Sequence, residues 1–205
     1  MANVQRVNGF RPVKHLSGAP YNGQFNIYEI VANDSTATMV GDLVKGDNGT
    51  GTDVYPTCVR HGTTGEVTSG EAIGVIVGFV TMPAQAANPS APNLDVPLHR
   101  RASTKAYAMV ADAPDLIFEV QDGATTPTTK TQIGLNTGFM ATAGSTTTGA
   151  SGMITGTSAP STATTLPLRI MGIVNSPDNE AGAAYQRLLV MINTHRYGSV
   201  GTTGV

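Results

Sequence analysis

The stretch Glu71–Thr81, EAIGVIVGFVT, is the most hydrophobic in the chain. It is rich in Val and Ile, which favour strands, and glycines interrupt it at Gly74 and Gly78. Because polar residues do not alternate with the apolar ones, the pattern predicts a strand that is covered on both faces. We therefore expect it at the centre of the core of a β domain. Its apolar run is far shorter than the roughly 20 residues that span a bilayer, so no membrane partner is expected.

On either side of this strand, the apolar residues come in short bursts separated by Gly, Pro, Asn and Thr. This pattern is typical of strands and turns and differs from the sustained spacing of helices. The sequence therefore predicts a mainly β fold: a single β-sandwich or barrel-like domain, with the jelly roll among the candidate topologies. The other predicted strands are Phe25–Ala32, Thr38–Lys45, Lys105–Val110, Leu116–Gln121, Leu166–Asn175 and Ala184–Asn193, the last with a helix beginning near Glu180 as its rival.

Turn residues predict how some of these strands connect. The segment Ala111–Asp115 contains Pro and Asp and separates two of the predicted strands, so a hairpin with a five-residue loop is expected there. The glycines and the Asn-Gly pair of Gly46–Gly51 predict a hairpin tip. Met82–Pro97 contains four prolines, which predict an extended surface connection.

Two segments differ in composition from the rest of the chain. Residues 1–22 interleave Gly and Pro with a few apolar side chains and predict an extended N-terminal arm, which leaves residues 23–205 as the β domain. Within that domain, residues 122–166 are nearly all Thr, Gly, Ser and Ala, with too few apolar side chains to bury a core of their own. We expect this tract either to be mobile or to lie against something else.

Charge and cysteine content exclude several kinds of partner. The chain has a formal net charge of -2, and only 13% of its residues are charged. Since nucleic-acid binding needs clustered positive charge, and the longest Lys/Arg run is Arg100–Arg101, no nucleic-acid partner is expected. The start, MANVQRVNGF, has no apolar signal core, so no secretion signal is expected. The single Cys58 excludes an internal disulfide.

The sequence predicts neither a metal site nor a cofactor. Its four histidines, at positions 15, 61, 99 and 195, lack the spacing of zinc ligands. The segment Asp47–Asp53 has oxygen donors at alternate positions, but it lacks the middle acid and the terminal Glu of a calcium loop, so an ordinary turn is favoured.

Catalytic patterns are equally weak, and we expect no catalytic residue. Ser151 lies outside any Gly-x-Ser-x-Gly turn, and Cys58 is expected to be a small buried hydrophobe even though Arg60 and His61 follow it. The acid pairs Asp112/Asp115 and Asp178/Glu180 lie in predicted turns, where carboxylates commonly cap amides. The few aromatic residues are scattered, which gives poor support for a stacking platform for sugars or bases.

Near its beginning the chain contains Asn8–Gly23, NGFRPVKHLSGAPYNG, followed by Val40–Val44, VGDLV. These segments resemble the start of a group of tailed-bacteriophage virion proteins, the head decoration or cement proteins. The resemblance continues through Ile73–Phe79, Phe118–Gln121 and Val174–Glu180, so it spans most of the chain apart from the Thr-rich tract.

This resemblance implies a structural protein without enzymatic activity that is made in the host cytoplasm and binds the outer surface of the capsid. Its partners would be the major capsid protein and itself, as a homotrimer that ties neighbouring coat subunits together. The arm is our first choice for the capsid contact, because extended segments can add a strand or lie in a groove. Its expected capsid-binding residues are Phe10, Arg11, Pro12, Lys14 and His15.

Alternatives remain open at this stage. Phe10 could instead close the protein's own core, with the neighbouring cations solvated. A different virion role is also compatible with a Thr- and Gly-rich β protein, such as a head fibre, a tail part or a carbohydrate-binding module. A hydrolase would have to use Cys58 with His61, or the turn at Asp112 and Asp115.

Overall fold

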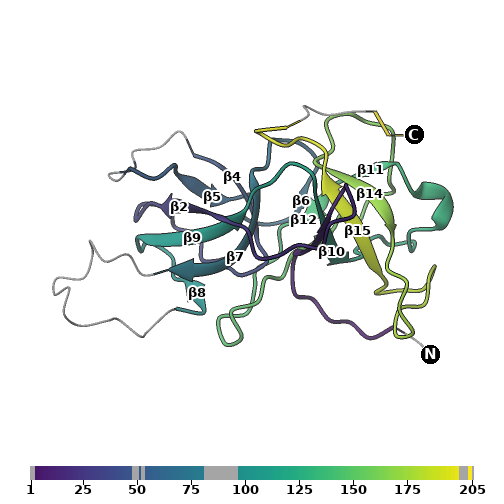
Figure 1. The fold of residues 1–205 in the computed structure, drawn as a ribbon. Helices are drawn as coiled ribbons and strands as arrows, with labels where there is room; N and C mark the ends of the chain where they lie inside the picture. The colour runs from purple at the N-terminus through teal and green to yellow at the C-terminus, as the bar shows by residue number, and fades with distance from the viewer. Residues whose placement is uncertain (1–2, 48–50, 52–53, 81–96, 199–202, 205) are drawn as a thin grey trace.

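The computed structural model describes residues 3–47, 51, 54–80, 97–198 and 203–204, and these form a mainly β, sandwich-like fold (Figure 1). The predicted fold class is therefore confirmed. Two five-stranded antiparallel sheets dominate it, joined by a three-stranded and a two-stranded sheet. Among the described residues the helical structure is the short 3-10 turn η2 (Lys130–Gln132), and no helix there is long and apolar enough to cross a membrane.

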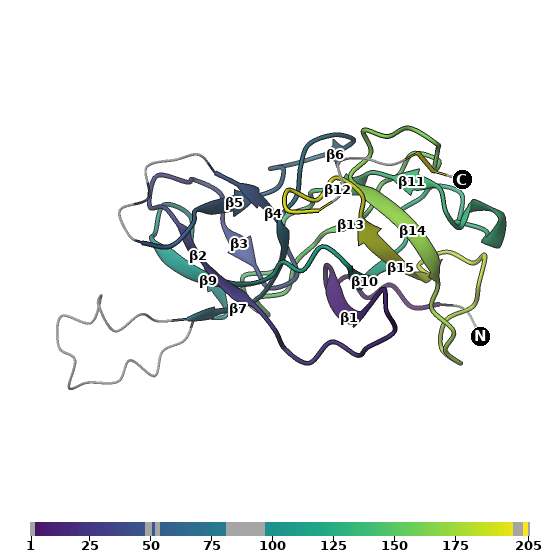
Figure 2. The ribbon, with the colours of Figure 1, turned by 45° about the horizontal axis from the view of Figure 1, so that its top comes forward.

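The first sheet has the order β2-β9-β7-β4-β5 and curls toward a barrel (Figure 2). Its edges approach each other where the Glu29 N–H donates to the Pro56 carbonyl at 2.9 Å. The predicted central strand is confirmed, since β7 pairs with β9 on one side and with β4 on the other. The strands are β2 (Asn26–Ile30), β4 (Leu43–Gly46), β5 (Cys58–Arg60), β7 (Gly74–Val80) and β9 (Ala106–Ala111).

The second sheet has the order β1-β10-β15-β14-β11 and so combines strands from the beginning, the middle and the last part of the chain (Figure 2). It consists of β1 (Arg11–His15), β10 (Leu116–Gln121), β11 (Asn136–Thr137), β14 (Leu168–Ile173) and β15 (Arg187–Ile192). The smaller sheets are formed by β13 (Ile154–Thr155), β12 (Phe139–Met140) and β6 (Glu66–Val67), and by β3 (Thr38–Met39) with β8 (His99–Arg100).

A shared core holds the sheets together. Leu43 and Val75 of the first sheet belong to the same buried cluster as Phe118 and Val190 of the second sheet and Phe139 of the three-stranded sheet. A second cluster, which includes Ile76, lies inside the curled first sheet. Burial of such apolar surface is the main favourable contribution to folding, so the two large sheets stabilise each other.

Two predictions about the strands are settled by the pairing. The predicted hairpin across Ala111–Asp115 is wrong, because β9 lies in the first sheet and β10 in the second. The short turn between them carries the chain from one sheet to the other, and Ala111 and Leu116 on its two sides are both buried in the shared core. The prediction of a final strand is confirmed, since β15 pairs with both β10 and β14 and the rival helix is not formed.

The Thr-rich tract, residues 122–166, lies against the rest of the protein and contributes β11, β12 and β13. Two of its large apolar side chains, Phe139 and Met153, are buried in the shared core, whereas Ile133 is 40% exposed. Of the two expectations for the tract, packing against another part is therefore the correct one. Residues 82–96 of the predicted connection Met82–Pro97, and the centre of the predicted loop Gly46–Gly51, lie outside the described residues.

Candidate docking surface

The N-terminal segment is folded onto the protein's own body. Strand β1 pairs with β10 on one side, and the chain then turns back so that the Tyr21 N–H donates to the Val13 carbonyl at 2.9 Å. Gly18 makes this turn with a φ of +92°, a value that favours glycine. We call residues 11–21 the N-terminal hairpin. The predicted capsid-binding residues after Phe10 all lie in it.

Phe10 is not available as an anchor for another protein in this structure. Its side chain is 1% exposed and meets Phe139 edge to face, with 6.3 Å between the ring centroids. Its N–H also donates to the Gly41 carbonyl at 2.9 Å. The alternative that Phe10 closes the protein's own core is the one the structure supports, and its expected role in capsid contact is corrected accordingly.

Pro12 and His15 hold the hairpin to the body. Pro12 lies opposite the buried Phe118 in the β1–β10 register, so it faces the interior. His15 lies 3.0 Å from a carboxylate oxygen of Asp115 through its Nδ1, and the Leu16 N–H donates to the Asp115 carbonyl. These contacts fix where the hairpin lies on the second sheet.

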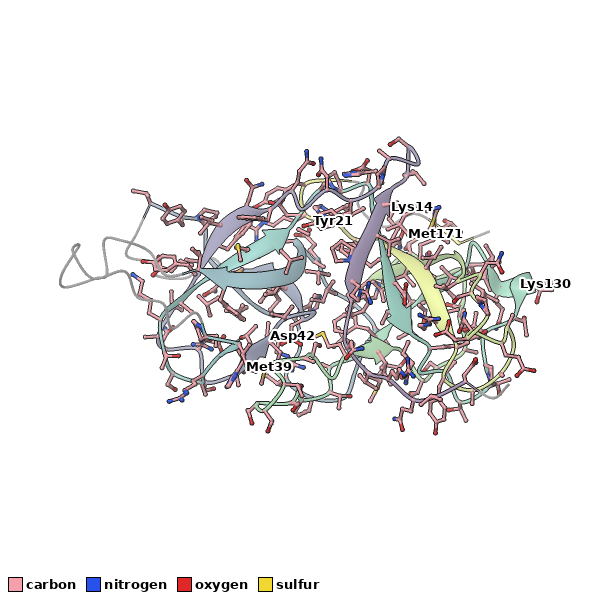
Figure 3. All side chains as sticks on the ribbon, turned by 60° about the horizontal axis from the view of Figure 1, so that its bottom comes forward. Lys14, Tyr21, Met39, Asp42, Lys130 and Met171 are labelled. Atoms are coloured by element: carbon pink, nitrogen blue, oxygen red, sulfur yellow. The ribbon has the colours of Figure 1, made fainter. Side chains whose placement is uncertain are left out.

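Arg11 and Lys14 point to the outer face of the second sheet. In the β1–β10 register they lie opposite Glu119 and Ile117, whose neighbours Phe118 and Leu116 face the core. Residues directly opposite each other in an antiparallel pair project to the same side. Neither cation has a salt-bridge partner among the described residues. Lys14 is seen on this side of the molecule in Figure 3.

The same face continues across β15 and β14. The register places Leu189 and Met191 of β15 beside Glu119 and Ile117, and places Arg169 of β14 beside Met191. Met171 is also seen from this side (Figure 3). The face combines half-buried apolar side chains with four of the 12 Lys and Arg residues of the chain. We define the docking face as Arg11, Lys14, Glu119, Arg169, Arg187, Leu189 and Met191.

The charge of the docking face is positive although the chain is weakly acidic. Its one carboxylate, Glu119, lies 3.1 Å from Arg187, which also pairs with Asp178. Arg11 and Lys14 form no salt bridge in the described structure, so the docking face carries four cations against the single carboxylate of Glu119. Such a face is complementary to an acidic partner surface.

A groove of about 240 Å³ borders the docking face, between residues 3–11 and the ends of β10 and β15. Arg6 and Arg11 line it together with Tyr185, whose ring is 45% exposed. Tyr185 has a φ of 60°, which is strained for a bulky side chain. Strained residues are concentrated at binding sites, so Tyr185 marks the groove as part of the candidate surface.

The suspected nucleophile Cys58 and its neighbour His61 are parts of the core. Cys58 is fully buried, and burial raises the pKa of its thiol. Burial lowers the pKa of His61 to about 4, and its ring packs against Phe139 with 5.1 Å between the centroids. Both groups are therefore uncharged near neutral pH, and the prediction that Cys58 is a small buried hydrophobe is confirmed.

The remaining suspected catalytic groups have structural partners. The Ser151 hydroxyl donates to buried Asp42 at 2.6 Å, and the Tyr28 hydroxyl donates to Asp112 at 2.7 Å. Asp115 holds His15, as described above. Asp178 pairs with Arg187, and at Glu180 it is the backbone N–H that donates to the Asn3 side chain. No group of three His, Cys, Asp or Glu side chains in the described parts of the chain could hold a metal ion.

No family model, curated protein or solved structure matches the chain.

The sequence located only part of the docking face. It singled out Arg11 and Lys14 but not Arg169, Arg187, Leu189 and Met191. The alternation of apolar residues in Ala184–Asn193 was the available signal, since it separates an inner from an outer set. Which strands would lie beside it could not be read from that pattern.

Proposed function

We propose that this chain is a virion structural protein that binds the outside of a phage capsid and stabilises the shell by linking neighbouring major capsid proteins. The observation that carries the proposal is the docking face, because Arg11 and Lys14 lie in the segment with the strongest resemblance to head decoration proteins. The proposed site residues are Arg11 and Lys14 for contact, with Pro12 and His15 holding them in place.

The shape of the site supports binding through a rigid face in place of a loose arm. A preformed sheet loses little conformational entropy when it docks, whereas a disordered arm must be ordered first. The apolar Leu189 and Met191 add contact area beside the cations.

We further propose a homotrimer, in which several such faces bind one shell and modest contacts add through high effective concentration.

Co-sedimentation tests this function. The purified protein is mixed with empty, expanded phage heads that lack it, and light scattering gives the mass of the free protein. We expect saturable binding and heads that survive more heat afterwards. A stable free oligomer that does not bind heads would contradict the proposal and favour a tail or fibre role.

A further inference from the structure

A second site lies on the first sheet, where the structure gathers aromatic rings that are scattered in the sequence. A pocket of about 680 Å³ is lined by Phe25, Tyr28, Tyr55 and Tyr197, which are four of the 11 aromatic residues of the chain. A stacking platform has poor support from the sequence because these residues lie far apart in it, whereas the fold brings them to one pocket. We call this site the aromatic pocket. None of its lining residues belongs to the docking face.

Two of the four rings of the aromatic pocket are open to solvent, while Tyr28 is buried and Tyr55 is half-buried. Phe25 is 45% exposed and Tyr197 is 56% exposed, which is unusual for side chains of this size. Tyr55 packs edge to face on Tyr107 with 5.8 Å between the centroids. Exposed, fixed rings of this kind offer apolar faces to a ligand at small entropic cost.

The polar groups of the pocket are mainly acceptors. Asp112 accepts hydrogen bonds from the Asn26 amide at 3.0 Å and from the Tyr28 hydroxyl at 2.7 Å. Because the Asn26 amide nitrogen donates to Asp112, its side-chain oxygen and the remaining lone pairs of Asp112 are left as acceptors on residues that are exposed and half-buried. A ligand that supplies several O–H donors would form hydrogen bonds with these acceptors.

The charge of the pocket narrows the ligand class. The Asp112 carboxylate disfavours phosphates and other anions. Single cations are disfavoured as well, because Asp112 is already held by two side-chain donors. The adjoining hollow, which shares Tyr55, Pro56 and Tyr197 with the pocket, is lined by both Asp47 and Arg196 and adds no net charge. What fits is a neutral ligand with apolar ring faces and many hydroxyls.

The geometry points to a binding site for neutral saccharides in the aromatic pocket, with Phe25, Tyr55 and Tyr197 packing against sugar rings and with Asn26 and Asp112 accepting hydrogen bonds from hydroxyls. This site is independent of capsid binding. On a protein displayed at a capsid surface it would give the particle an affinity for glycans.

Saturation-transfer NMR and titration calorimetry test the site with maltose, cellobiose, lactose and chitobiose as probes. We expect at least one to bind with a roughly millimolar dissociation constant, as is usual for an open site. Phe25→Ala and Tyr197→Ala should each weaken binding about 3- to 10-fold, and both variants should fold because these rings are half exposed.

The matched control is Tyr185→Asn, which removes a ring of 45% exposure from the other groove and should leave saccharide binding unchanged. Asn26→Ala should weaken binding without removing any ring. Three results would overturn the proposal: no binding of any probe, equal binding by the ring variants, or binding of tetramethylammonium in preference to the sugars. Because this site is independent of capsid binding, Phe25→Ala and Tyr197→Ala should bind empty heads as the wild type does. A failure of the saccharide proposal can therefore be told apart from a failure of the proposed function.

Discussion

Single buried polar residues connect the segments that the sequence pattern could not place. Asp42 is fully buried and lies 3.0 Å from Arg60 of β5, while it also accepts bonds from Ser151 of the Thr-rich tract and from the Met39 N–H. Met39 and Asp42 are labelled in Figure 3. The bonds to Arg60 and Ser151 join different parts of the chain, so Asp42 fixes their relative positions.

Replacing Asp42 by Asn should lower the free energy of unfolding by about 3 kcal/mol, because it leaves Arg60 with an uncompensated buried charge. Urea denaturation measures this change. The matched control is Glu71→Gln, an exposed carboxylate whose loss should change stability by less than about 0.5 kcal/mol. Equal effects of the two substitutions would show that Asp42 does not connect the segments as described.

His61 should make the fold sensitive to mild acid. Its pKa is about 4 in the folded protein, against 6.5 for a histidine in water, so the unfolded chain binds the proton first as pH falls. The stability that neutral His61 provides is complete above pH 6.5 and is lost progressively as pH falls toward 4. Between about pH 7 and pH 5 the loss should be about 2 kcal/mol.

The variant His61→Gln should remove this part of the pH dependence. Ile76→Val, which also alters a buried side chain but does not titrate, should lower stability while it keeps the wild-type slope. Unfolding free energies at the two pH values give the comparison. A wild-type slope in His61→Gln would mean that another group is responsible, and buried His195, whose pKa burial also lowers, would be the next to test.

At the scale of secondary-structure elements, the sequence predicted strands better than their partners. Apolar bursts marked β2, β7, β10, β14 and β15, because each strand's own side chains determine its pattern. The partner of a strand depends on contacts far apart in sequence. That is why Leu116–Gln121 was assigned to a hairpin, whereas it pairs with β1 and β15.

The N-terminal hairpin provides the first prediction at this scale. Deleting Met1–Pro20 removes Phe10 from the core and β1 from the second sheet, so it should lower stability as well as any binding. Phe10→Ala alone should cost about 3–5 kcal/mol. Thermal unfolding measures the loss of stability in both the deletion variant and Phe10→Ala. Unchanged stability of the deletion variant would mean that the segment is a free arm after all.

The Thr-rich tract provides the second prediction at the scale of secondary-structure elements. Asp122 accepts hydrogen bonds from the Thr128 N–H and from Gln186, which tie the start of the tract to the residue before β15. Asp122→Ala should therefore increase hydrogen exchange in residues 123–128 more than elsewhere. Asp178→Ala is the control, since that carboxylate is exposed, and it should leave exchange in this segment as it was. Equal hydrogen exchange of residues 123–128 in the wild type and in both variants would contradict the proposed role of Asp122.

At the scale of the whole molecule, a rigid β body carries one positively charged face. The sequence foresaw the mainly β fold and two of the cations, because both are local properties. It could not foresee that Arg169 and Arg187 lie on the same face, since this depends on the order of strands in the second sheet. Nor could it foresee that the aromatic residues meet in one pocket.

The most direct measurement of the central claim is co-sedimentation of the double variant Arg11→Glu/Lys14→Glu with empty heads, beside the matched control Arg101→Glu/Lys130→Glu. The control reverses the same charge at exposed positions outside the docking face. We expect the docking-face variant to bind at least about tenfold more weakly and the control to bind as the wild type does, with equal stability for all three. Binding of the docking-face variant at wild-type affinity would contradict the proposed capsid-binding role.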